Sequence, residues 1–278
     1  MKKLQQNWNF GFYRTKRISC NSDGDLNGVY CIQYDDKRLY SGHRDHVIRI
    51  WDMRTFLLVG TMTGHTGSIL AMSYQGATLI SGSSDSTIRV WCIPTRVCVK
   101  VVIHHHASIL HIWFLNNIVA SASKDKTIAM WRLSGHSLEL QARLKGHKAA
   151  VNAVEFDSHF IVSASGDSTI KLWDATTYKC INTLQNHKRG IACLHYRYPI
   201  LMSGSSDSDI RIWDVEKGVC IKTLIGHQEL VRCIRFDDRY IISGSYDGHI
   251  MIWNTRIAML PKAIPLVTTI NKHSARVF

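Results

Sequence analysis

Short stretches of alternating apolar and polar residues, separated by turns rich in Gly, Asp and Ser, run through the chain. Between residues 68 and 102 four such stretches follow one another, and they read SILAMSY, ATLIS, STIRVW and VCVKVV. Alternation with a period of two is typical of half-buried β-strands, and short polar turns favour antiparallel neighbours. The pattern predicts an all-β fold in which each repeat forms a four-stranded antiparallel sheet.

The pattern repeats along the chain, because a tryptophan returns at intervals of about 40 residues. The tryptophans of this series are Trp51, Trp91, Trp131, Trp173, Trp213 and Trp253. An aspartate stands six residues before each, at Asp45, Asp85, Asp125, Asp167, Asp207 and Asp247. A serine stands ten residues before each, at Ser41, Ser81, Ser121, Ser163, Ser203 and Ser243. Farther upstream, and at a fixed distance from the last five tryptophans, a histidine stands at His65, His105, His147, His187 and His227.

The Ser, Asp and His of one repeat have the composition of a hydrolase triad. One active site needs one nucleophile, whereas this set recurs along the chain, so we predict a structural role and no catalytic residue. The aspartate is expected in the tight turn between the second and third strands, where it accepts hydrogen bonds from turn amides and from the histidine. The histidine can reach the serine, and the serine can accept from the indole N–H of the tryptophan.

The tryptophan series carries two recurrent dipeptides. Gly-His occurs at 64–65, 146–147 and 226–227, and Trp-Asp occurs at 51–52, 173–174 and 213–214. These residues resemble the WD40 repeat family, and the resemblance covers nearly the whole chain. It implies a β-propeller, whose sheets stand radially about a central channel. We expect the seven-bladed family type, with six complete blades and a truncated seventh.

Both ends of the chain depart from a complete propeller. Residues 271–278, NKHSARVF, resemble the opening of a seventh repeat, and residues 17–20, RISC, resemble the outer strand that would close it. We expect residues 28–278 to form the propeller with an incomplete last blade. Residues 1–27 are expected to form an N-terminal segment that contains the ring-closing strand. Open sheet edges of this kind invite aggregation or pairing with another chain.

Composition and charge narrow the choice of binding partner and of cellular compartment. The chain has 278 residues, of which 45% are hydrophobic, as is ordinary for a globular protein. No apolar run of about 18 residues is present, so no membrane span is expected. Eight cysteines without a C-x-x-C pair favour reduced thiols and a cytoplasmic or nuclear location. The net charge of +13 favours an anionic partner.

Function is expected where equivalent positions of the repeats carry different residues, because the framework is common to all of them. The residues just before the turn aspartates should line the channel rim, and they are Arg44, Ser84, Lys124, Gly166, Ser206 and Tyr246. Five residues after the histidine slots, at the start of the inner strands, stand Tyr30, Leu70, Leu110, Asn152, Ala192 and Arg232. The same segment supplies Ser68, Arg189, Gly190 and Leu230.

These positions combine arginines with hydroxyls and small residues. Such a set fits a phosphate group, which brings about −1.5 to −2 charges and three strong acceptor oxygens. Arg44 belongs to the first repeat and Arg189 to the fifth, so one phosphate cannot engage both. Two anionic groups on one extended peptide could engage both, because four residues span up to about 13 Å.

At these positions the resemblance narrows to one family. The segments that carry it read GVYCIQYDD, SGSSDSTIRVW, VSASGDSTIKLW, HKRGIACLHYR and LVRCIRFDDRYIISGSYDG. They resemble, almost residue for residue, the blades of beta-TrCP-type F-box/WD40 proteins, the substrate receptors of an SCF ubiquitin ligase. The resemblance implies recognition of doubly phosphorylated Asp-pSer-Gly-x-x-pSer degrons on the top face of the propeller. Ubiquitin transfer would then belong to partner subunits, and this chain would not be an enzyme.

The resemblance also assigns roles to individual residues. The first phosphate is expected to meet Tyr30, Arg44, Ser68 and Ser84. The second is expected to meet Arg189, Gly190 and Ser206, while the degron aspartate faces Arg232 and Tyr246. The peptide is expected to run along Leu70, Leu110, Asn152, Gly166, Ala192 and Leu230. Lys124 and Arg276 are expected to act mainly through their charge. Residues 1–27 are too short for an F-box, so a ligase adaptor is expected as a partner only of a longer form.

Other functions remain open at this stage. The positive charge would suit a propeller that binds nucleic acid, but the charges are interspersed rather than gathered in one block, which makes nucleic acid the weaker candidate. A generic WD40 scaffold for unmodified proteins is the other alternative. The run His-His-His at 104–106 raises a metal site, yet His105 fills a framework position and no spaced cysteines or carboxylates accompany it. We predict no metal and no cofactor.

Overall fold

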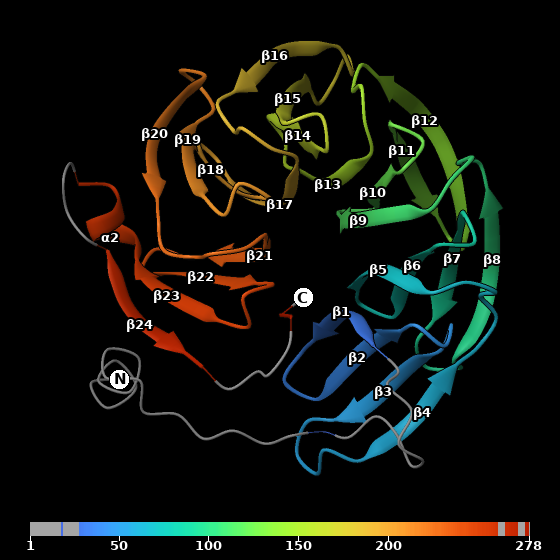
Figure 1. The fold of residues 1–278 in the computed structure, drawn as a ribbon. Helices are drawn as coiled ribbons and strands as arrows, with labels where there is room; N and C mark the ends of the chain where they lie inside the picture. The colour runs from blue at the N-terminus through green and yellow to red at the C-terminus, as the bar shows by residue number, and fades with distance from the viewer. Residues whose placement is uncertain (1–17, 19–27, 261–264, 272–275, 278) are drawn as a thin grey trace. The chain divides into compact units, whose positions relative to one another are not determined.

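The computed structural model describes residues 18, 28–260, 265–271 and 276–277. These residues form almost only β-strands, which Figure 1 labels β1 to β24. The strands make six four-stranded sheets, which we call blades one to six in chain order. Strands that are consecutive in sequence lie side by side within each blade, and in blades one and two every pair is antiparallel. The predicted all-β class and the four-stranded repeat are therefore confirmed.

The strand bounds are as follows. Blade one contains β1 (Val29–Tyr34), β2 (Arg38–His43), β3 (Ile48–Asp52) and β4 (Leu58–Met62). Blade two contains β5 (Ile69–Gln75), β6 (Thr78–Ser83), β7 (Thr87–Cys92) and β8 (Val97–Ile103). Blade three contains β9 (Ile109–Leu115), β10 (Ile118–Ser123), β11 (Thr127–Ser134) and β12 (Ser137–Lys145). Blade four contains β13 (Val151–Phe156), β14 (Phe160–Ser165), β15 (Thr169–Asp174) and β16 (Cys180–Gln185). Blade five contains β17 (Ile191–Arg197), β18 (Ile200–Ser205), β19 (Ile210–Asp214) and β20 (Val219–Leu224). Blade six contains β21 (Val231–Phe236), β22 (Tyr240–Ser245), β23 (Ile250–Asn254) and β24 (Leu266–Ile270), with the one-turn helix α2 (Thr255–Ala258) after β23.

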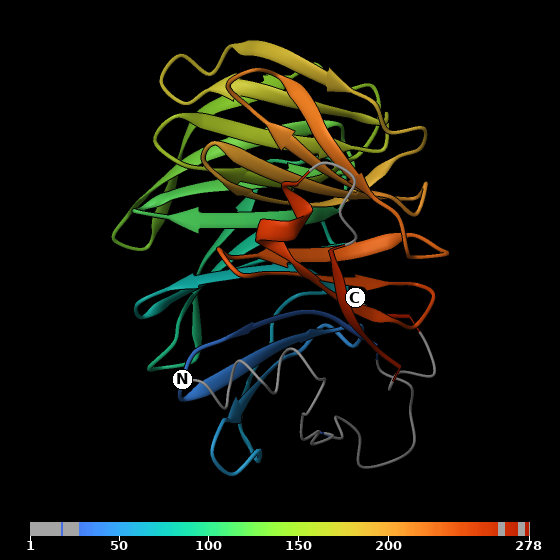
Figure 2. The ribbon, with the colours of Figure 1, turned by 90° about the vertical axis from the view of Figure 1, so that its left-hand side faces the viewer.

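The described chain divides into two compact units. The N-terminal unit holds residues 18, 28–161 and 174–179, and the C-terminal unit holds the rest. Blades one to three lie wholly in the N-terminal unit, and blades five and six lie wholly in the C-terminal unit. Figure 2 shows the blades from the side, where the orange and red strands of blades five and six run beside one another.

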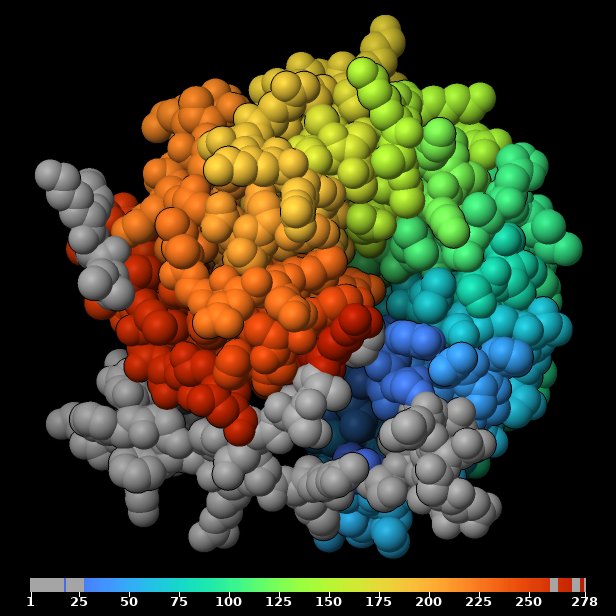
Figure 3. Space-filling view, in the orientation of Figure 1, coloured from blue at the N-terminus to red at the C-terminus, as the bar shows by residue number. Residues whose placement is uncertain are grey.

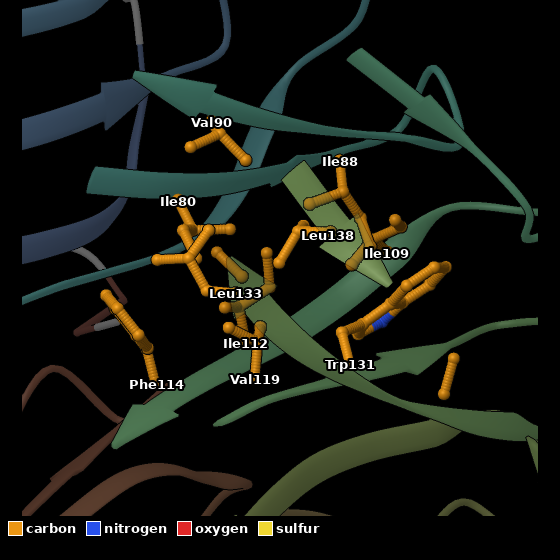
Figure 4. Close-up of a cluster of buried hydrophobic side chains, with 12 residues drawn as sticks. Ile80, Ile88, Val90, Ile109, Ile112, Phe114, Val119, Trp131, Leu133 and Leu138 are labelled. Atoms are coloured by element: carbon orange, nitrogen blue, oxygen red, sulfur yellow. The ribbon is translucent and has the colours of Figure 1, made fainter. Parts of the chain in front are cut away.

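Blades two and three share one hydrophobic core inside the N-terminal unit (Figure 4). Ile80, Ile88 and Val90 of blade two pack with Ile112 and Trp131 of blade three, and each is at most 2% exposed. Alternation along each strand places these side chains on one face, which is why they meet. Full burial of each such side chain contributes roughly 1.5–3 kcal/mol. The loops at the ends of these strands are therefore held on a single rigid body.

The predicted polar network is confirmed in blade two. The indole N–H of Trp91 donates to the Ser81 hydroxyl oxygen over 2.8 Å, and that hydroxyl lies 2.7 Å from Nε2 of His65. Nδ1 of His65 lies 2.8 Å from the Asp85 carboxylate. Each group thus donates to the next, from tryptophan to serine to histidine to aspartate. The same network recurs in blades three, five and six, through His105, His187 and His227.

Burial sets the charge states inside this network. Burial lowers the pKa of His65, although its hydrogen bond to Asp85 opposes the shift, so the imidazole is neutral. Burial alone would raise the pKa of Asp85, but hydrogen bonds from the Thr87 hydroxyl and the Thr66 N–H lower it to about 2. The aspartate is therefore ionised and accepts from the turn amides, as predicted.

Blade one satisfies its serine and tryptophan with a different histidine. It has no histidine at the position relative to Trp51 that His65 takes relative to Trp91. Instead His43, from the end of β2, places Nε2 2.7 Å from the Ser41 hydroxyl, which accepts from Trp51 over 2.8 Å. Burial lowers the pKa of His43 to about 4, so this imidazole is also neutral. The sequence analysis did not identify His43.

Of residues 271–278, which resemble the opening of a seventh repeat, the structure describes 271, 276 and 277. The N–H of Val277 donates to the carbonyl of Ser245 over 3.0 Å, and Val277 packs on Gly244. Val231, the first residue of β21, packs on Gly204 in the same way. Figure 3 shows the dark red residues 276–277 against the surface of blade six. Val277 thus takes the place of the first inner-strand residue of a further repeat, as expected, whereas the RISC segment lies outside the described residues apart from Ile18.

Half-buried His195 of β17 lies outside this repeated network. Its Nδ1 accepts the N–H of Phe236 over 3.0 Å, and its ring packs edge-on against that phenyl ring at 4.8 Å. Burial, followed by the positive charges of Arg235 and Arg197, lowers the pKa of His195 to about 3. Its protonation is therefore strongly disfavoured in the folded chain.

Replacing Ser81 by Ala should destabilise the fold. The change leaves the Trp91 indole without its acceptor and His65 without its partner, which costs about 1–3 kcal/mol for a buried polar group. Urea unfolding followed by tryptophan fluorescence measures the loss, with Ser134→Ala at an exposed position as the matched control. A Ser81→Ala chain with the unfolding midpoint of the parent would contradict the network's structural role.

The free energy of unfolding should fall as the pH drops below about 6.5. Histidines whose pKa is lowered in the folded chain stay neutral there, whereas the same histidines take up protons in the unfolded chain. His195, with its pKa lowered to about 3, contributes stability that is complete above the unfolded pKa and is lost as the pH falls toward 3. His195→Gln keeps an acceptor for Phe236 and should flatten the dependence of unfolding free energy on pH between 7 and 5. Exposed His136→Gln should leave the slope unchanged, and equal slopes for the two variants would refute this account.

Candidate functional site

Two loops at the same end of each blade, together with the first two residues of the inner strand, carry the predicted site residues other than Arg276. One is the turn between the second and third strands, and the other leads into the inner strand; we call them the rim loops. In five blades the N–H of the residue before the turn aspartate donates to a carbonyl of the other rim loop. The pairs are Arg44 to Gly28, Ser84 to Ser68, Lys124 to Ser108, Ser206 to Gly190 and Tyr246 to Leu230, at 2.9 to 3.0 Å. The two predicted sets of rim residues are thus held side by side within each of these blades.

The four residues expected at the first phosphate lie together in the N-terminal unit. The Ser68 hydroxyl donates to the carbonyl of Arg44 over 3.2 Å and so links blade two to blade one. The carbonyl of Ser68 accepts from Ser84, as described above. Tyr30 has its ring next to Gly28, whose carbonyl accepts from Arg44. Arg44 and Ser84 are exposed, while Tyr30 and Ser68 are half-buried. The backbone positions that carry these hydroxyls and this guanidinium therefore lie in one stretch of rim.

The residues expected at the second phosphate lie together in the C-terminal unit. Buried Ser205 donates to the carbonyls of Arg189 and Gly190, at 3.1 and 3.0 Å, and clamps this loop onto the turn that contains Ser206. A Cβ on Gly190 would lie 3.1 Å from the Cα and the carbonyl oxygen of Gly166. That Gly166 lets a ligand approach stays a prediction; the structure shows that it admits the backbone of Gly190.

Arg232, Tyr246 and Arg276 also belong to the C-terminal unit. The guanidinium carbon of Arg276 stands 4.6 Å from the centre of the Tyr246 ring, a cation–π contact that orients both side chains. Arg232 is half-buried as the second residue of β21.

Burial raises the pKa of the Cys193 thiol to about 12, although the positive charge of Arg232 opposes the shift. Cys193 is therefore a core residue and not a nucleophile.

The remaining predicted residues keep the same register in their blades. Leu70, Leu110, Asn152 and Ala192 are each the second residue of an inner strand. Ala192 is buried at 9% exposure, and the other three are half-buried. Lys124 is exposed, and Leu230 is half-buried beside Tyr246. That these residues bind a peptide stays a prediction.

Three residues at the rim were missed by the sequence analysis. Ser108 stands three residues after His105, as Ser68 stands three after His65, so the repeat itself carries the signal. Ser205 and its equivalents pin the inner loop, and they follow the framework serine by two residues. His43 occupies that same position in blade one, and no sequence pattern indicates its different bond.

Within the part of the chain that the structure describes, neither a cluster of metal-binding residues nor a membrane-spanning helix is found. No group of His, Cys, Asp and Glu residues there could hold a metal ion. In the 104–106 run, His105 is bonded to Ser121 and Asp125, and His104 packs edge-on against Trp131 at 5.1 Å. None of the described helices is long and apolar enough to cross a bilayer.

Comparison with protein families matches the repeat to one model, described as "WD domain, G-beta repeat". The matched segments are residues 16–52, 56–92, 96–132, 138–174, 178–214 and 218–254. Each segment ends one residue after a tryptophan of the series. The matches return with the period of the blades but are offset by one strand: from the second match on, each contains the outer strand of one blade and the first three strands of the next.

Curated relatives match over short segments. The chain is 47% identical over 68 residues to the F-box and WD repeat domain-containing 11-A protein of Danio rerio, which is 24% of this chain and 12% of that protein. It is 47% identical over 65 residues to the F-box/WD repeat-containing protein lin-23 of Caenorhabditis elegans, 23% of this chain and 10% of that protein. It is 38% identical over 61 residues to the probable E3 ubiquitin ligase complex SCF subunit sconB of Talaromyces marneffei, 22% of this chain and 9% of that protein. These segments span about a tenth of the relatives' length.

A solved structure matches over most of the chain. The crystal structure of the computationally designed Ika8 protein superposes with a TM-score of 0.77 and 27% sequence identity. The match covers 92% of this chain and 78% of that protein. The fold described above is thus one that an experimental structure also adopts.

Replacing Gly190 by Ala should disturb the rim of blade five. The added methyl group would press on the backbone of Gly166 at 3.1 Å, and overpacking of this kind costs about 1–3 kcal/mol. The unfolding free energy in urea measures the loss. Gly28→Ala is the matched control, because the nearest atom to its Cβ is 4.0 Å away. A Gly190→Ala chain as stable as Gly28→Ala would show that the contact with Gly166 is not constrained.

Proposed function

The chain belongs to the WD40 repeat family, and we propose that its propeller is a substrate-recognition module of an SCF-type ubiquitin ligase that binds doubly phosphorylated degrons. The degron class is Asp-pSer-Gly-x-x-pSer, bound by the rim loops. The relatives named above are F-box/WD repeat proteins or an SCF subunit, which supports this class of role. Because the matched segments are short, the phosphorylated substrates and the ligase assembly are proposals for this chain.

The arrangement of Arg44, Ser68 and Ser84 carries the proposal. A phosphoserine needs a cation and several donors in one place, because it brings about −1.5 to −2 charges. Exposed Arg44 supplies the cation. The Ser84 N–H bond to the Ser68 carbonyl holds the two serines together, and the Ser68 hydroxyl donates to the Arg44 carbonyl. The Ser84 hydroxyl is proposed to donate to the phosphate, and the Ser68 hydroxyl to exchange its bond to Arg44 for one to a phosphate oxygen. A guanidinium suits this task better than an ammonium group, because its fork can bind two phosphate oxygens at once.

A second set of the same composition supports a second phosphate. Arg189 is exposed, and Ser206 lies next to it through the bond to Gly190. Ser205 holds this loop in place, so the donors are arranged before a ligand arrives. Preorganised donors lose less entropy on binding than mobile ones. Arg232 and Tyr246 are proposed to meet the degron aspartate.

Catalysis forms no part of the proposal. The Ser–His–Asp sets of blades two, three, five and six belong to the framework, where each hydroxyl already accepts from a tryptophan and contacts a histidine. Ubiquitin transfer is proposed to belong to partner subunits, and adaptor binding to a form of the protein that carries an F-box. Nucleic-acid binding through the net charge of +13 is an outcome that the experiment distinguishes.

Arg44→Ala and Arg232→Ala should each weaken binding of a doubly phosphorylated Asp-pSer-Gly-x-x-pSer peptide. Losing a hydrogen bond to a charged group costs about 1.5–3 kcal/mol, so the dissociation constant should rise about 10- to 100-fold. Fluorescence anisotropy of a labelled peptide measures the change, and thermal unfolding checks that the variants remain folded. Exposed Arg132→Ala, at the far end of β11, removes the same charge and should leave affinity unchanged.

The unphosphorylated peptide separates this function from the alternatives. It should not bind, whereas a generic scaffold would retain it. A polyanion-binding propeller would hold a single-stranded oligonucleotide as well as the phosphopeptide and would release both steeply with salt. Parent-like affinity of both arginine variants would refute the binding mode.

A further inference from the structure

The turn between β10 and β11 of blade three carries two lysines, whereas each of the other five described turns between a second and a third strand carries at most one lysine or arginine. Lys124 and Lys126 flank Asp125 in the turn between β10 and β11, and both are exposed. In blades two and five, serines occupy both of these flanking positions. Neither lysine forms an ion pair with any residue in the described ranges. Their charges are therefore available to a ligand.

The turn aspartate does not neutralise these lysines, because it is already engaged. His105 lies 2.8 Å from its carboxylate, and Arg143 of β12 approaches the same oxygen at 3.3 Å. Burial would raise the pKa of Asp125, but hydrogen bonds from Thr127 and His105 hold it well below its usual range. With Arg143 balancing Asp125, the two lysines remain as surplus positive charge.

Four hydrogen bonds fix the two loops of this blade against each other. The N–H of His106 donates to Asp125 over 3.2 Å, and the Ser123 hydroxyl donates to the carbonyl of Ala107 over 3.1 Å. The N–H of Lys124 donates to the carbonyl of Ser108 over 2.9 Å, and the His105–Asp125 contact completes the set. The backbone of Ser108 thus lies beside that of Lys124, in the position that Ser68 takes beside Ser84 in blade two.

This basic cluster stands on the same rigid body as the residues proposed for the first phosphate. The core in Figure 4 joins β6 and β7, which flank the turn of Ser84, to β9, β10 and β11 of blade three. Ile109, at the start of β9, packs directly on Gly82 near the end of β6. A peptide held at Ser68 and Ser84 would therefore keep a fixed relation to the lysines.

We propose that Lys124, Lys126 and the Ser108 hydroxyl form a third anion-binding subsite, which takes an additional phosphorylated side chain in the segment flanking the degron. The inference rests on the proposed function and extends it: the preferred substrates carry three phosphates, two in the motif and one outside it. Two ammonium groups and a hydroxyl match the charge and the acceptor oxygens of one phosphate.

A peptide series tests the subsite. The parent chain is titrated with the minimal doubly phosphorylated peptide, and with extended peptides that carry one more phosphoserine at successive positions in either flank. Extended peptides with serine at the same positions are the controls. One flank position should improve affinity about three- to tenfold, as expected for partly exposed charge-assisted contacts.

The variant Lys126→Asn should abolish this gain and leave the minimal peptide bound as before. Asparagine tolerates the left-handed backbone of this position, where φ is 71°, so the charge is removed without new strain. Lys100→Asn, at an exposed position of the outer strand β8, removes the same charge elsewhere and should keep the gain. Ser108→Ala should reduce the gain in part.

The outcomes separate the inference from the function on which it rests. If the minimal peptide binds and no third phosphate improves affinity, the subsite is refuted and the proposed function stands. If Lys100→Asn loses the gain as Lys126→Asn does, the effect is general charge attraction and the subsite is again refuted. A single-stranded oligonucleotide that removes the gain at an equal concentration of phosphate would also refute the subsite. If the minimal peptide does not bind, both proposals fail.

Discussion

Each blade depends on a buried serine hydroxyl that must form hydrogen bonds with two neighbouring side chains. In blade two it accepts from the Trp91 indole and donates to His65, and the histidine in turn donates to Asp85. Each of these polar groups would be costly to bury alone, because a lost partner leaves an uncompensated desolvation of about 1–3 kcal/mol. Together they are satisfied, so the tryptophan of the third strand, the inner loop and the turn cannot move independently.

This constraint explains why the rim is suited to binding. The aspartate that ends the network lies in the turn, next to the residue whose N–H bonds the inner loop. Variation at that neighbouring residue therefore changes the rim without touching the network: it is Arg44 in blade one, Lys124 in blade three and Tyr246 in blade six. A rigid framework with variable loops concentrates recognition at the loop positions.

The charges follow the same division between framework and rim. The turn aspartates are ionised and already bonded, so they do not cancel the charge of the rim arginines and lysines to the extent that a free carboxylate would. The buried histidines are neutral and leave the net charge of +13 to surface side chains. The framework thus supplies order, and the exposed basic residues supply attraction for an anionic segment.

The sequence by itself determined the strands, the order of the blades and the polar network. Those features repeat, and they depend on residues within one period, so alternation and spacing suffice to find them; the four stretches of the second repeat match β5 to β8 within two residues. It also identified Ser68, Ser84 and Ser206 as rim residues. Only the tertiary structure decided that His43 replaces the missing histidine of blade one, that Gly166 meets Gly190, and that Arg276 packs on Tyr246. The Gly166–Gly190 and Arg276–Tyr246 contacts depend on where separate turns or repeats come together in space, and no periodic pattern within one repeat encodes that distance. The His43–Ser41 bond joins residues two apart in β2, but it departs from the pattern that the other repeats share, so the repeat does not predict it.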